Sequence, residues 1–270
     1  VVGHTVCRFA QPPDGKKDLI PMILQDLLAA RKKAKKTRDK FPKGSFNYNV
    51  YEGLQLAYKV TANSLYGIIG ASTAPIRFRP IAACTTATGR KLIHFSANFV
   101  LKNYPGSEIT YGDTDSIFCK FKCVDRYGKP LKGLDAVNKS ILLCTEAAML
   151  ISKQLKYPHN LEFEKAILPF ILLSKKRYHG HYFTEYGSPS FYPNSMGIVL
   201  KRRDNAPILK HVFGKMIDII MEEQSIDKAI KFVKEECIKV LNGEFPLDMF
   251  VVSKTLRSYY KNPNQIAHNV

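Results

Sequence analysis

Two carboxylates lie one residue apart in the segment YGDTDS, which runs from Tyr111 to Ser116. Apolar segments flank the motif, and Gly and Asp are common turn residues, so the motif alone is typical of a β-hairpin turn. Such a turn would present Asp113 and Asp115 together at its tip. Carboxylates are the ligands that a hard cation such as Mg²⁺ prefers. Taken by itself, the motif leaves a structural turn and a metal site as alternatives.

Other metal sites have little support in the sequence. The six cysteines lack the paired spacing of a zinc site, and the seven histidines show no HExxH spacing. An EF-hand loop starting at Asp113 would have Phe118 at its sixth position, where Gly is required. The cysteines are interpreted as reduced, mostly buried thiols of an intracellular protein. Oxygen ligands therefore remain the best candidates for a metal site.

The charge of the chain indicates a polyanionic partner. There are 41 Lys and Arg against 23 Asp and Glu, which gives a formal net charge of +18 over 270 residues. Such a field favours nucleic acid or an anionic surface. The longest apolar run, AILPFILL at 166–173, is far short of the ~20 residues that cross a bilayer and contains a proline. We therefore expect no membrane insertion.

Hydrophobic periodicity predicts the elements that position these residues. Helices are expected over 19–40, 50–69, 81–103 and 135–156, and over most of the chain from residue 207 onward. Two short strands are expected around YGDTDS, and a strand pair over 160–183 in which Glu162 and Glu164 share one face. The first two helices would form an antiparallel hairpin. The predicted fold class is α+β.

The first predicted helix becomes strongly basic in its second half. Eight cations and one acid, Asp39, lie between Arg31 and Lys43, and a charge run of this kind is usually a solvated face. No GxxxxGK[ST] loop is present, so a triphosphate would have to be held by side-chain cations. Residues 31 and 35, like residues 59 and 63, are four apart and share a helix face.

Five motifs follow one another along the chain: KVTANSLYG (59–67), YGDTDS (111–116), LEFEK (161–165), SKKRY (174–178) and KRRDN (201–205). Together they resemble the successive signatures of family B DNA polymerases, most closely those of delta-type and large DNA virus replicative enzymes. The resemblance implies a right-hand architecture with an antiparallel palm sheet. The implied domains are a palm segment over 1–18, helical-hairpin fingers over 19–78, the palm with its YGDTDS hairpin over 79–205, and a partial, mostly helical thumb over 206–270.

The resemblance also implies an activity and roles for individual residues. The activity is template-directed DNA synthesis from dNTPs on primer-template DNA by two-metal nucleotidyl transfer, with Mg²⁺ replaceable by Mn²⁺. Asp115 would be the principal metal ligand, Asp113 a supporting ligand or positioning group, and Glu164 a nearby metal-site carboxylate whose alternative is a solvated strand face. Residues implied for dNTP binding are Arg31, Lys35, Lys59, Asn63 and Tyr66, the last having core packing as its alternative. Residues implied for DNA binding are Lys175, Lys176, Arg177, Tyr178, Arg202 and Arg203.

The sequence departs from the family pattern in two places. No DxxSLYPS-like segment is present, so we expect a fragment that lacks one metal-binding Asp and is inactive alone. Met196 stands before Gly197 where relatives often have Lys. A non-catalytic DNA-binding remnant is the main alternative, and a reverse transcriptase fits less well because its YxDD turn does not match. The family also implies a nuclear or viral replication site and a sliding-clamp partner.

Overall fold

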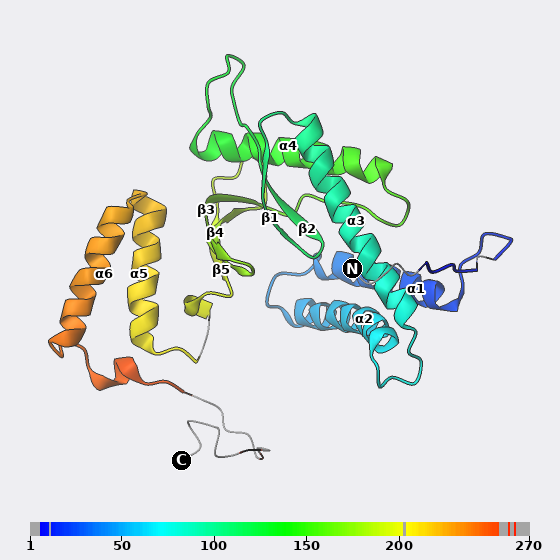
Figure 1. Cartoon of the computed structure of the whole chain (residues 1–270), viewed down its shortest axis with the longest axis horizontal. Coiled ribbons are helices and arrows are strands. Elements are labelled where there is room, and N and C mark those ends of the chain that lie inside the picture. Colours follow the sequence, from blue (N-terminus) through cyan, green and yellow to red (C-terminus); the bar gives the residue numbers. More distant parts are fainter. Residues whose placement is uncertain (1–5, 11, 202–203, 254–258, 260–261, 263–270) are drawn as a thin grey trace. The chain divides into compact units, whose positions relative to one another are not determined.

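The computed structural model describes residues 6–10, 12–201, 204–253, 259 and 262 (Figure 1). The chain divides into two compact units, Val1–His94 and Phe95–Val270. Helices and small antiparallel sheets alternate along the chain, which confirms the α+β class. None of the described helices has the length and apolar character that a bilayer crossing requires.

The first unit contains a helical hairpin made of α1 (Leu19–Arg38) and α2 (Phe46–Gly70). Ser45 starts α2 four residues earlier than periodicity predicted, because its hydroxyl accepts the backbone N–H of Tyr48 and so caps the helix. Arg38 at the end of α1 forms a 2.6 Å ion pair with Glu52 of α2. The Phe41 ring stacks on Tyr51 at a centroid distance of 5.9 Å. These contacts hold the two helices together at the end of the hairpin where the connecting loop lies.

Helix α3 (Arg79–Asn103) begins in the first unit and ends in the second. Its C-terminal turns contribute Val100 to a buried cluster with Phe121, Ala147 and Ile151. Phe121 directly follows strand β2 (Ser116–Lys120), whereas Ala147 and Ile151 lie on α4 (Gly133–Gln154). The cluster therefore joins the end of α3, the strand after YGDTDS and α4 into one core.

Two small antiparallel sheets occupy the second unit. One pairs β1 (Glu108–Asp113) with β2, and Asp113 lies opposite Ser116. The other has the order β3 (Ala166–Ser174), β4 (Arg177–Phe183), β5 (Tyr192–Met196). In this second sheet, Ser174 lies opposite Arg177, so Lys175 and Lys176 form the turn between β3 and β4.

The prediction of a strand from residue 160 is wrong over 160–165, because β3 begins only at Ala166. Ser152 of α4 satisfies the backbone of this segment instead: its hydroxyl accepts the Leu161 N–H at 2.8 Å and donates to the Leu161 carbonyl at 2.9 Å. Leu161 and Phe163 are nevertheless half-buried, while Glu162 and Glu164 are exposed. The predicted alternation is therefore present without the strand pairing.

The C-terminal part of the described chain is helical, as predicted. Helices α5 (Pro207–Glu223) and α6 (Ile226–Leu241) lie side by side (Figure 1), and the short 3-10 turns η1 (Val199–Lys201) and η2 (Leu247–Phe250) flank them. The chain reverses between the two helices at Gln224, whose φ is +51°. Ile217 and Met221 of α5 pack with Ile198 in a separate buried cluster.

Candidate active site

The tip of the β1–β2 hairpin is an unusually tight turn. The Asp115 N–H donates to the Asp113 carbonyl at 2.6 Å, and Thr114 between them has a φ of +55°. A hydrogen bond from residue i+2 back to residue i defines a γ-turn, and the form with positive φ is rare and strained. The Ser116 hydroxyl donates to the same Asp113 carbonyl at 3.2 Å. Asp113 and Asp115 are thus fixed at the two ends of one three-residue turn.

A cluster of aromatic side chains from β1, β2, β3 and β4 packs next to this turn and supports it. Phe118 of β2 stacks on Phe170 of β3 at a centroid distance of 5.7 Å, and it meets Tyr178 of β4 edge-on at 5.5 Å. Tyr111 of β1 contacts both Phe118 and Tyr178, at 5.2 and 5.9 Å. Offset and edge-on ring pairs contribute about 0.5–1.5 kcal/mol each beyond area burial. The cluster therefore fixes the YGDTDS hairpin on the β3–β4 hairpin.

The turn of the β3–β4 hairpin reaches the carboxylate end of the first one. The Lys176 N–H donates to the Tyr111 hydroxyl at 2.9 Å, across 65 residues of sequence. Its ammonium forms a 3.0 Å ion pair with Asp113. Lys176 adopts a left-handed φ of +61°, which turns the chain so that both contacts can form. The sequence motifs YGDTDS and SKKRY are thereby brought into direct contact.

The β3–β4 turn requires a glycine at position 197, where the chain passes close to it. The φ of Gly197 is +61°, and a Cβ at this position would lie 2.2 Å from the Lys176 carbonyl oxygen. The residue before it, Met196, pairs with Tyr178 at the end of β5. Only glycine therefore allows β5 to approach the β3–β4 turn so closely. A Lys in place of Met196 would leave this geometry unchanged, because the close approach involves only the glycine.

The ion pair sets the electrostatics of the tip. Lys176 is the main cause of a lowered pKa at Asp113, and Thr114, whose hydroxyl donates to the same carboxylate at 3.2 Å, lowers it further. The pKa of Lys176 is raised in turn by Asp113. Both side chains are solvent-accessible, so the pair stabilises the fold little. Its effect is to extend the pH range over which Asp113 is ionised toward lower pH.

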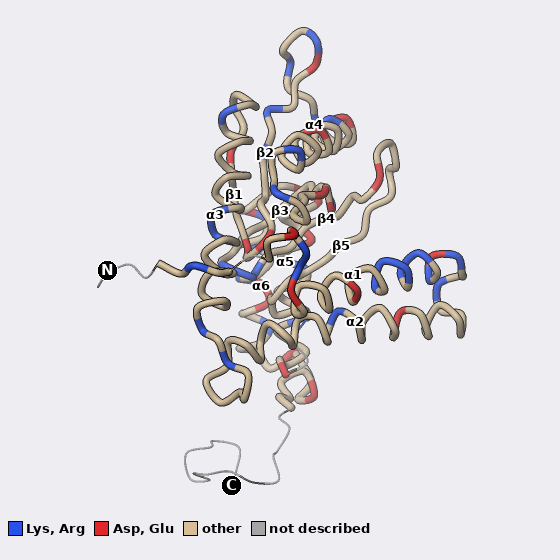
Figure 2. The backbone as a smooth tube through the Cα atoms, turned by 90° about the vertical axis from the view of Figure 1, so that its right-hand side faces the viewer, with Lys and Arg blue, Asp and Glu red and all other residues tan. Residues whose placement is uncertain are grey.

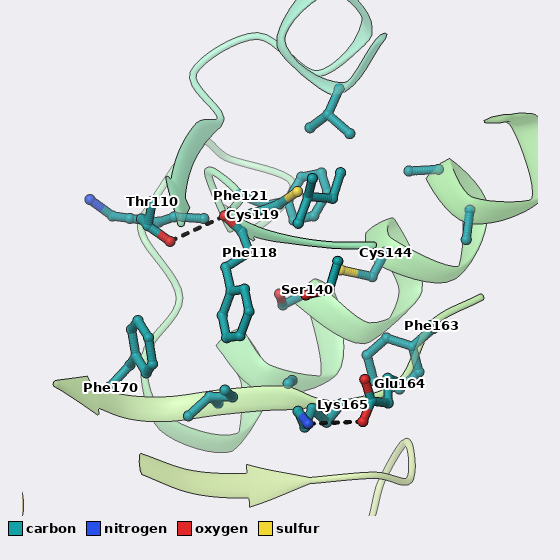
Figure 3. A pocket seen from close by; sticks show the side chains of 18 of the residues that line it. Thr110, Phe118, Cys119, Phe121, Ser140, Cys144, Phe163, Glu164, Lys165 and Phe170 are labelled. Atoms are coloured by element: carbon teal, nitrogen blue, oxygen red, sulfur yellow. Dashed lines mark hydrogen bonds and ion pairs between the residues drawn. The ribbon is translucent and has the colours of Figure 1, made fainter. Parts of the chain in front are cut away.

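Asp115 and Glu164 both line a cavity of about 900 Å³ between β2, α4 and the segment that precedes β3 (Figure 3). Glu164 is 75% exposed and forms a 2.9 Å ion pair with Lys165, drawn as a dashed line in the figure. Nowhere in the described ranges do three or more His, Cys, Asp or Glu side chains come together as a metal-binding group. The structure thus places Asp113 and Asp115 together but does not add Glu164 to them as a third ligand.

Cysteines line the apolar end of the same cavity. Cys119 and Cys144 appear there in Figure 3, and burial raises their pKa values to about 11 and about 12. All six cysteines are free thiols, in agreement with the prediction. The expectation that most would be buried is wrong, since five are half-buried and Cys237 is exposed. The cavity accounts for part of this exposure.

The residues implied for dNTP binding lie on the helical hairpin of the first unit. Lys59, Asn63 and Tyr66 are exposed along α2. Tyr66 is 41% exposed and its hydroxyl donates to the Ala82 carbonyl at 3.5 Å, so it is not an ordinary core residue. On α1, the Arg31 guanidinium donates to the buried Gln55 side chain at 3.3 Å. Lys35 contributes to the lowered pKa of Glu52, whose largest cause is Arg38.

The residues implied for DNA binding divide into three groups. Lys175, Lys176 and Arg177 are exposed at the β3–β4 turn. Tyr178 is only 7% exposed and belongs to the aromatic cluster. Arg202 and Arg203 lie outside the described residues. Tyr178 is thus placed to support the turn rather than to present its ring at the surface.

Sequence reasoning missed the residues that support the tip. Phe118 and Phe170 are 52 positions apart in the sequence, and no local pattern indicated that their rings stack at 5.7 Å. Gly197 was noticed only as the neighbour of Met196. No strand was predicted to end at Met196, so no local pattern indicated a close backbone approach at Gly197.

Comparison with known proteins identifies the class. A family model described as DNA polymerase family B matches residues 4–270. The chain belongs to DNA polymerase family B.

Individual relatives agree with this assignment. The chain is 42% identical to the DNA polymerase of Pyramimonas orientalis virus, over 100% of this chain and 26% of that protein. It is 37% identical to the DNA polymerase of Paramecium bursaria Chlorella virus NY2A, over 92% of this chain and 26% of the relative. It is 35% identical to the DNA polymerase delta catalytic subunit of Candida albicans, over 93% of this chain and 24% of that protein. The chain thus spans about a quarter of the length of these relatives.

Proposed function

We propose that this chain forms part of a DNA-directed DNA polymerase and carries its YGDTDS carboxylates. The observation that supports this most strongly is the γ-turn that fixes Asp113 and Asp115 at the tip of a braced hairpin. A plain two-residue hairpin loop can also place its first central residue at positive φ, but it has no need for an ion pair from a second hairpin. Strain of this kind is found at sites where geometry serves a function.

The donor set suits Mg²⁺, with Mn²⁺ as a substitute. Asp113 and Asp115 offer carboxylate oxygens, and protein-bound Mg²⁺ is usually held by one or two carboxylates together with substrate phosphates. The two-residue set is therefore compatible with a pair of ions completed by a nucleotide. When bound, such ions activate the primer 3′-hydroxyl and stabilise the charge that develops on the leaving pyrophosphate. Glu164 would need to leave its ion pair with Lys165 to join them.

Asp113 and Asp115 have different surroundings, which supports different roles. Asp113 is held by Lys176 and Thr114, so its carboxylate is positioned and kept ionised. Asp115 faces the cavity, and no side-chain partner for it is seen in the described part of the chain. We infer that Asp115 is the principal metal ligand and Asp113 the supporting one.

The helical hairpin would bind the triphosphate of the incoming dNTP. Lys59 and Asn63 lie exposed one turn apart on α2, which supports a shared role. Arg31 of α1 lies beside Gln55 of α2, and Lys35 of α1 lies near Glu52 of α2. These two cations therefore lie along the line where the two helices meet. Charge-assisted hydrogen bonds from Lys and Arg are the usual means of holding phosphate without a glycine-rich loop.

Primer-template DNA would contact the β3–β4 turn through Lys175, Lys176 and Arg177, with Arg202 and Arg203 as further phosphate contacts. Phosphate contacts position a duplex without reading its sequence, as a polymerase requires. We propose the right-hand arrangement with fingers over 19–78, palm over 1–18 and 79–205, and thumb from 206. A sliding clamp and a nuclear or viral site of replication remain predictions from the family.

The test is an Asp115→Ala substitution in the polymerase polypeptide that contains these residues. Single-turnover primer extension should fall by several orders of magnitude, on the order of 10³-fold or more, because a principal metal ligand is lost. Affinity for primer-template DNA should change little. Glu222→Ala removes an equally exposed acid on α5 and should leave extension unchanged. Extension by the Asp115 variant within about tenfold of wild type would contradict the assignment, because the loss of a metal ligand should cost far more.

A further inference from the structure

The cations of α1 fall on two faces of the helix that have different surroundings. On one face, Arg31 donates to Gln55, and Arg38 forms ion pairs with Glu52 and Asp39 at 2.6 Å each. Lys35 also faces Glu52 closely enough to lower its pKa. Arg31 and Lys35 are the α1 cations that the proposed nucleotide site uses, and both lie beside polar side chains of α2.

The second face of α1 and the turn directly after the helix carry four lysines that we call the lysine stripe. Its members are exposed and line a shallow groove of about 520 Å³ together with Ala29 and Thr37. They are Lys32, Lys33, Lys36 and Lys40. Figure 2 shows the corresponding concentration of basic residues in the C-terminal half of α1 and its absence along most of α2. Across the described residues, no acid forms an ion pair with any member of the stripe.

Helix stability does not explain the stripe. Cations in the last turn of a helix interact favourably with its dipole, and Lys36 lies there. Lys32 and Lys33 precede that turn and gain little from it. Like charges four residues apart on a helix repel, and Lys32 and Lys36 form such a pair, whereas Lys40 lies two residues beyond the end of α1. Helix stability therefore gives no reason for this row of lysines.

We propose that the lysine stripe binds the sugar-phosphate backbone of single-stranded nucleic acid. Lysine is a compact, flexible point charge that binds phosphate without demanding one geometry. Lys32 and Lys36 are separated by about 6 Å along the helix axis, and Lys40 follows just after the helix end, so the cations form a row that can follow one strand. No aromatic residue lines the groove, which favours contact with backbone phosphates over base stacking. This surface is distinct from the proposed nucleotide contacts and does not depend on them.

The experiment compares two triple variants of the 270-residue chain. Lys32→Gln, Lys36→Gln, Lys40→Gln removes three charges from the stripe. Lys139→Gln, Lys153→Gln, Lys156→Gln removes three exposed lysines on and just after α4, so the net charge is matched. Glutamine keeps helix propensity close to that of lysine, and far-UV circular dichroism checks the fold. Binding of a fluorescent oligothymidylate of about 16 nucleotides is followed by anisotropy between about 50 and 200 mM salt.

We expect the stripe variant to lose about tenfold or more in affinity at the lowest salt. Its slope of log K against log salt should become shallower by about 2, since each phosphate contact on a single strand contributes about 0.7. The α4 variant should bind nearly as wild type. A third variant with arginine at the three stripe positions should also keep wild-type binding, because it retains the charges.

Three results would overturn the proposal. The first is an equal loss of affinity in both glutamine variants, which would indicate only the general field of a basic protein. The second is unchanged binding by the stripe variant. The third is a stripe variant that keeps oligonucleotide binding but loses binding to phosphatidylserine vesicles, which would make the stripe a membrane-surface contact.

Discussion

The helical hairpin of α1 and α2 and the two β-hairpins that carry Asp113 and Lys176 are stabilised in different ways. The helical hairpin is held by partners close in sequence: Arg38 and Glu52 are 14 residues apart, and Ser45 and Tyr48 are 3 apart. The β-hairpins are joined by Tyr111 and Lys176, which are 65 residues apart. The helices leave many long cationic side chains exposed. The β-hairpins fix two short carboxylates on a tight turn.

This difference follows from what each region would bind. A triphosphate or a nucleic-acid backbone is large and carries several charges, so flexible Lys and Arg side chains can adapt to it. A metal site needs oxygens placed within a few tenths of an ångström. Because Asp side chains are short, a displacement of the backbone moves their carboxylate oxygens by a similar amount. We therefore expect backbone changes to be tolerated in the helical hairpin and damaging in the β-hairpins.

The largest effect should come from Gly197→Ala. A left-handed alanine costs about 1–2 kcal/mol, and the overpacking against the Lys176 carbonyl, which a Cβ would approach to 2.2 Å, adds about 1–3 kcal/mol. The free energy of unfolding of the second unit should fall by about 2–5 kcal/mol in total. Urea unfolding followed by tyrosine fluorescence measures it. A loss below about 0.5 kcal/mol would show that the β3–β4 turn is not held as tightly as its geometry indicates.

The second largest effect, a loss of catalytic efficiency with dNTP, should come from Lys59→Ala. Loss of a charge-assisted contact to the triphosphate should lower kcat/KM for dNTP by about tenfold to a hundredfold, equivalent to about 1.4–2.7 kcal/mol. Stability should hardly change, because the side chain is exposed. Steady-state incorporation at varied dNTP concentration measures the effect. If DNA affinity falls instead while dNTP kinetics are unchanged, Lys59 belongs to the DNA-binding surface.

A smaller effect of opposite sign should come from Gly53→Ala in α2. Gly53 lies inside the helix, and a Cβ there would meet nothing within 4 Å. Alanine should therefore stabilise the first unit by about 0.5–1 kcal/mol through helix propensity. Thermal unfolding by circular dichroism compares this variant with Gly197→Ala. If Gly53→Ala and Gly197→Ala lowered the free energy of unfolding equally, the two regions would not differ in their tolerance of backbone changes.

The smallest effect on stability should come from Lys176→Gln, whose main consequence is on pH dependence. Lys176 lowers the pKa of Asp113, so its removal should raise that pKa and move the acid limb of the pH–activity profile to higher pH. The ion pair stabilises the fold above the unfolded-state pKa of Asp and loses this effect as the pH falls through the lowered native value. Because both side chains are solvent-accessible, the pair contributes little to stability. If the acid limb does not move in the Lys176→Gln variant, the activity does not depend on the ionisation of Asp113.

Sequence patterns predicted most elements of the fold. Helical periods placed α1, α2, α3 and α4 within a few residues of their observed ends, and the alternation after Asp115 predicted β2. The strand predicted over 160–165 failed because Ser152 supplies hydrogen bonds to Leu161 that a neighbouring strand would otherwise provide. Alternating burial is a local property, whereas strand pairing depends on a partner elsewhere in the chain.

The sequence by itself determined the family, through five motifs in order, and the chemical nature of the candidate groups: paired Asp residues, clustered cations and a basic net charge. Only the tertiary structure decided which of these groups meet. It brought Lys176 to Asp113, left Glu164 paired with Lys165, and separated the α1 cations into a partnered face and the lysine stripe. The physical reason is that residue types and spacings are fixed along the chain, whereas ion pairs and ring contacts depend on distances that packing sets between segments far apart in sequence.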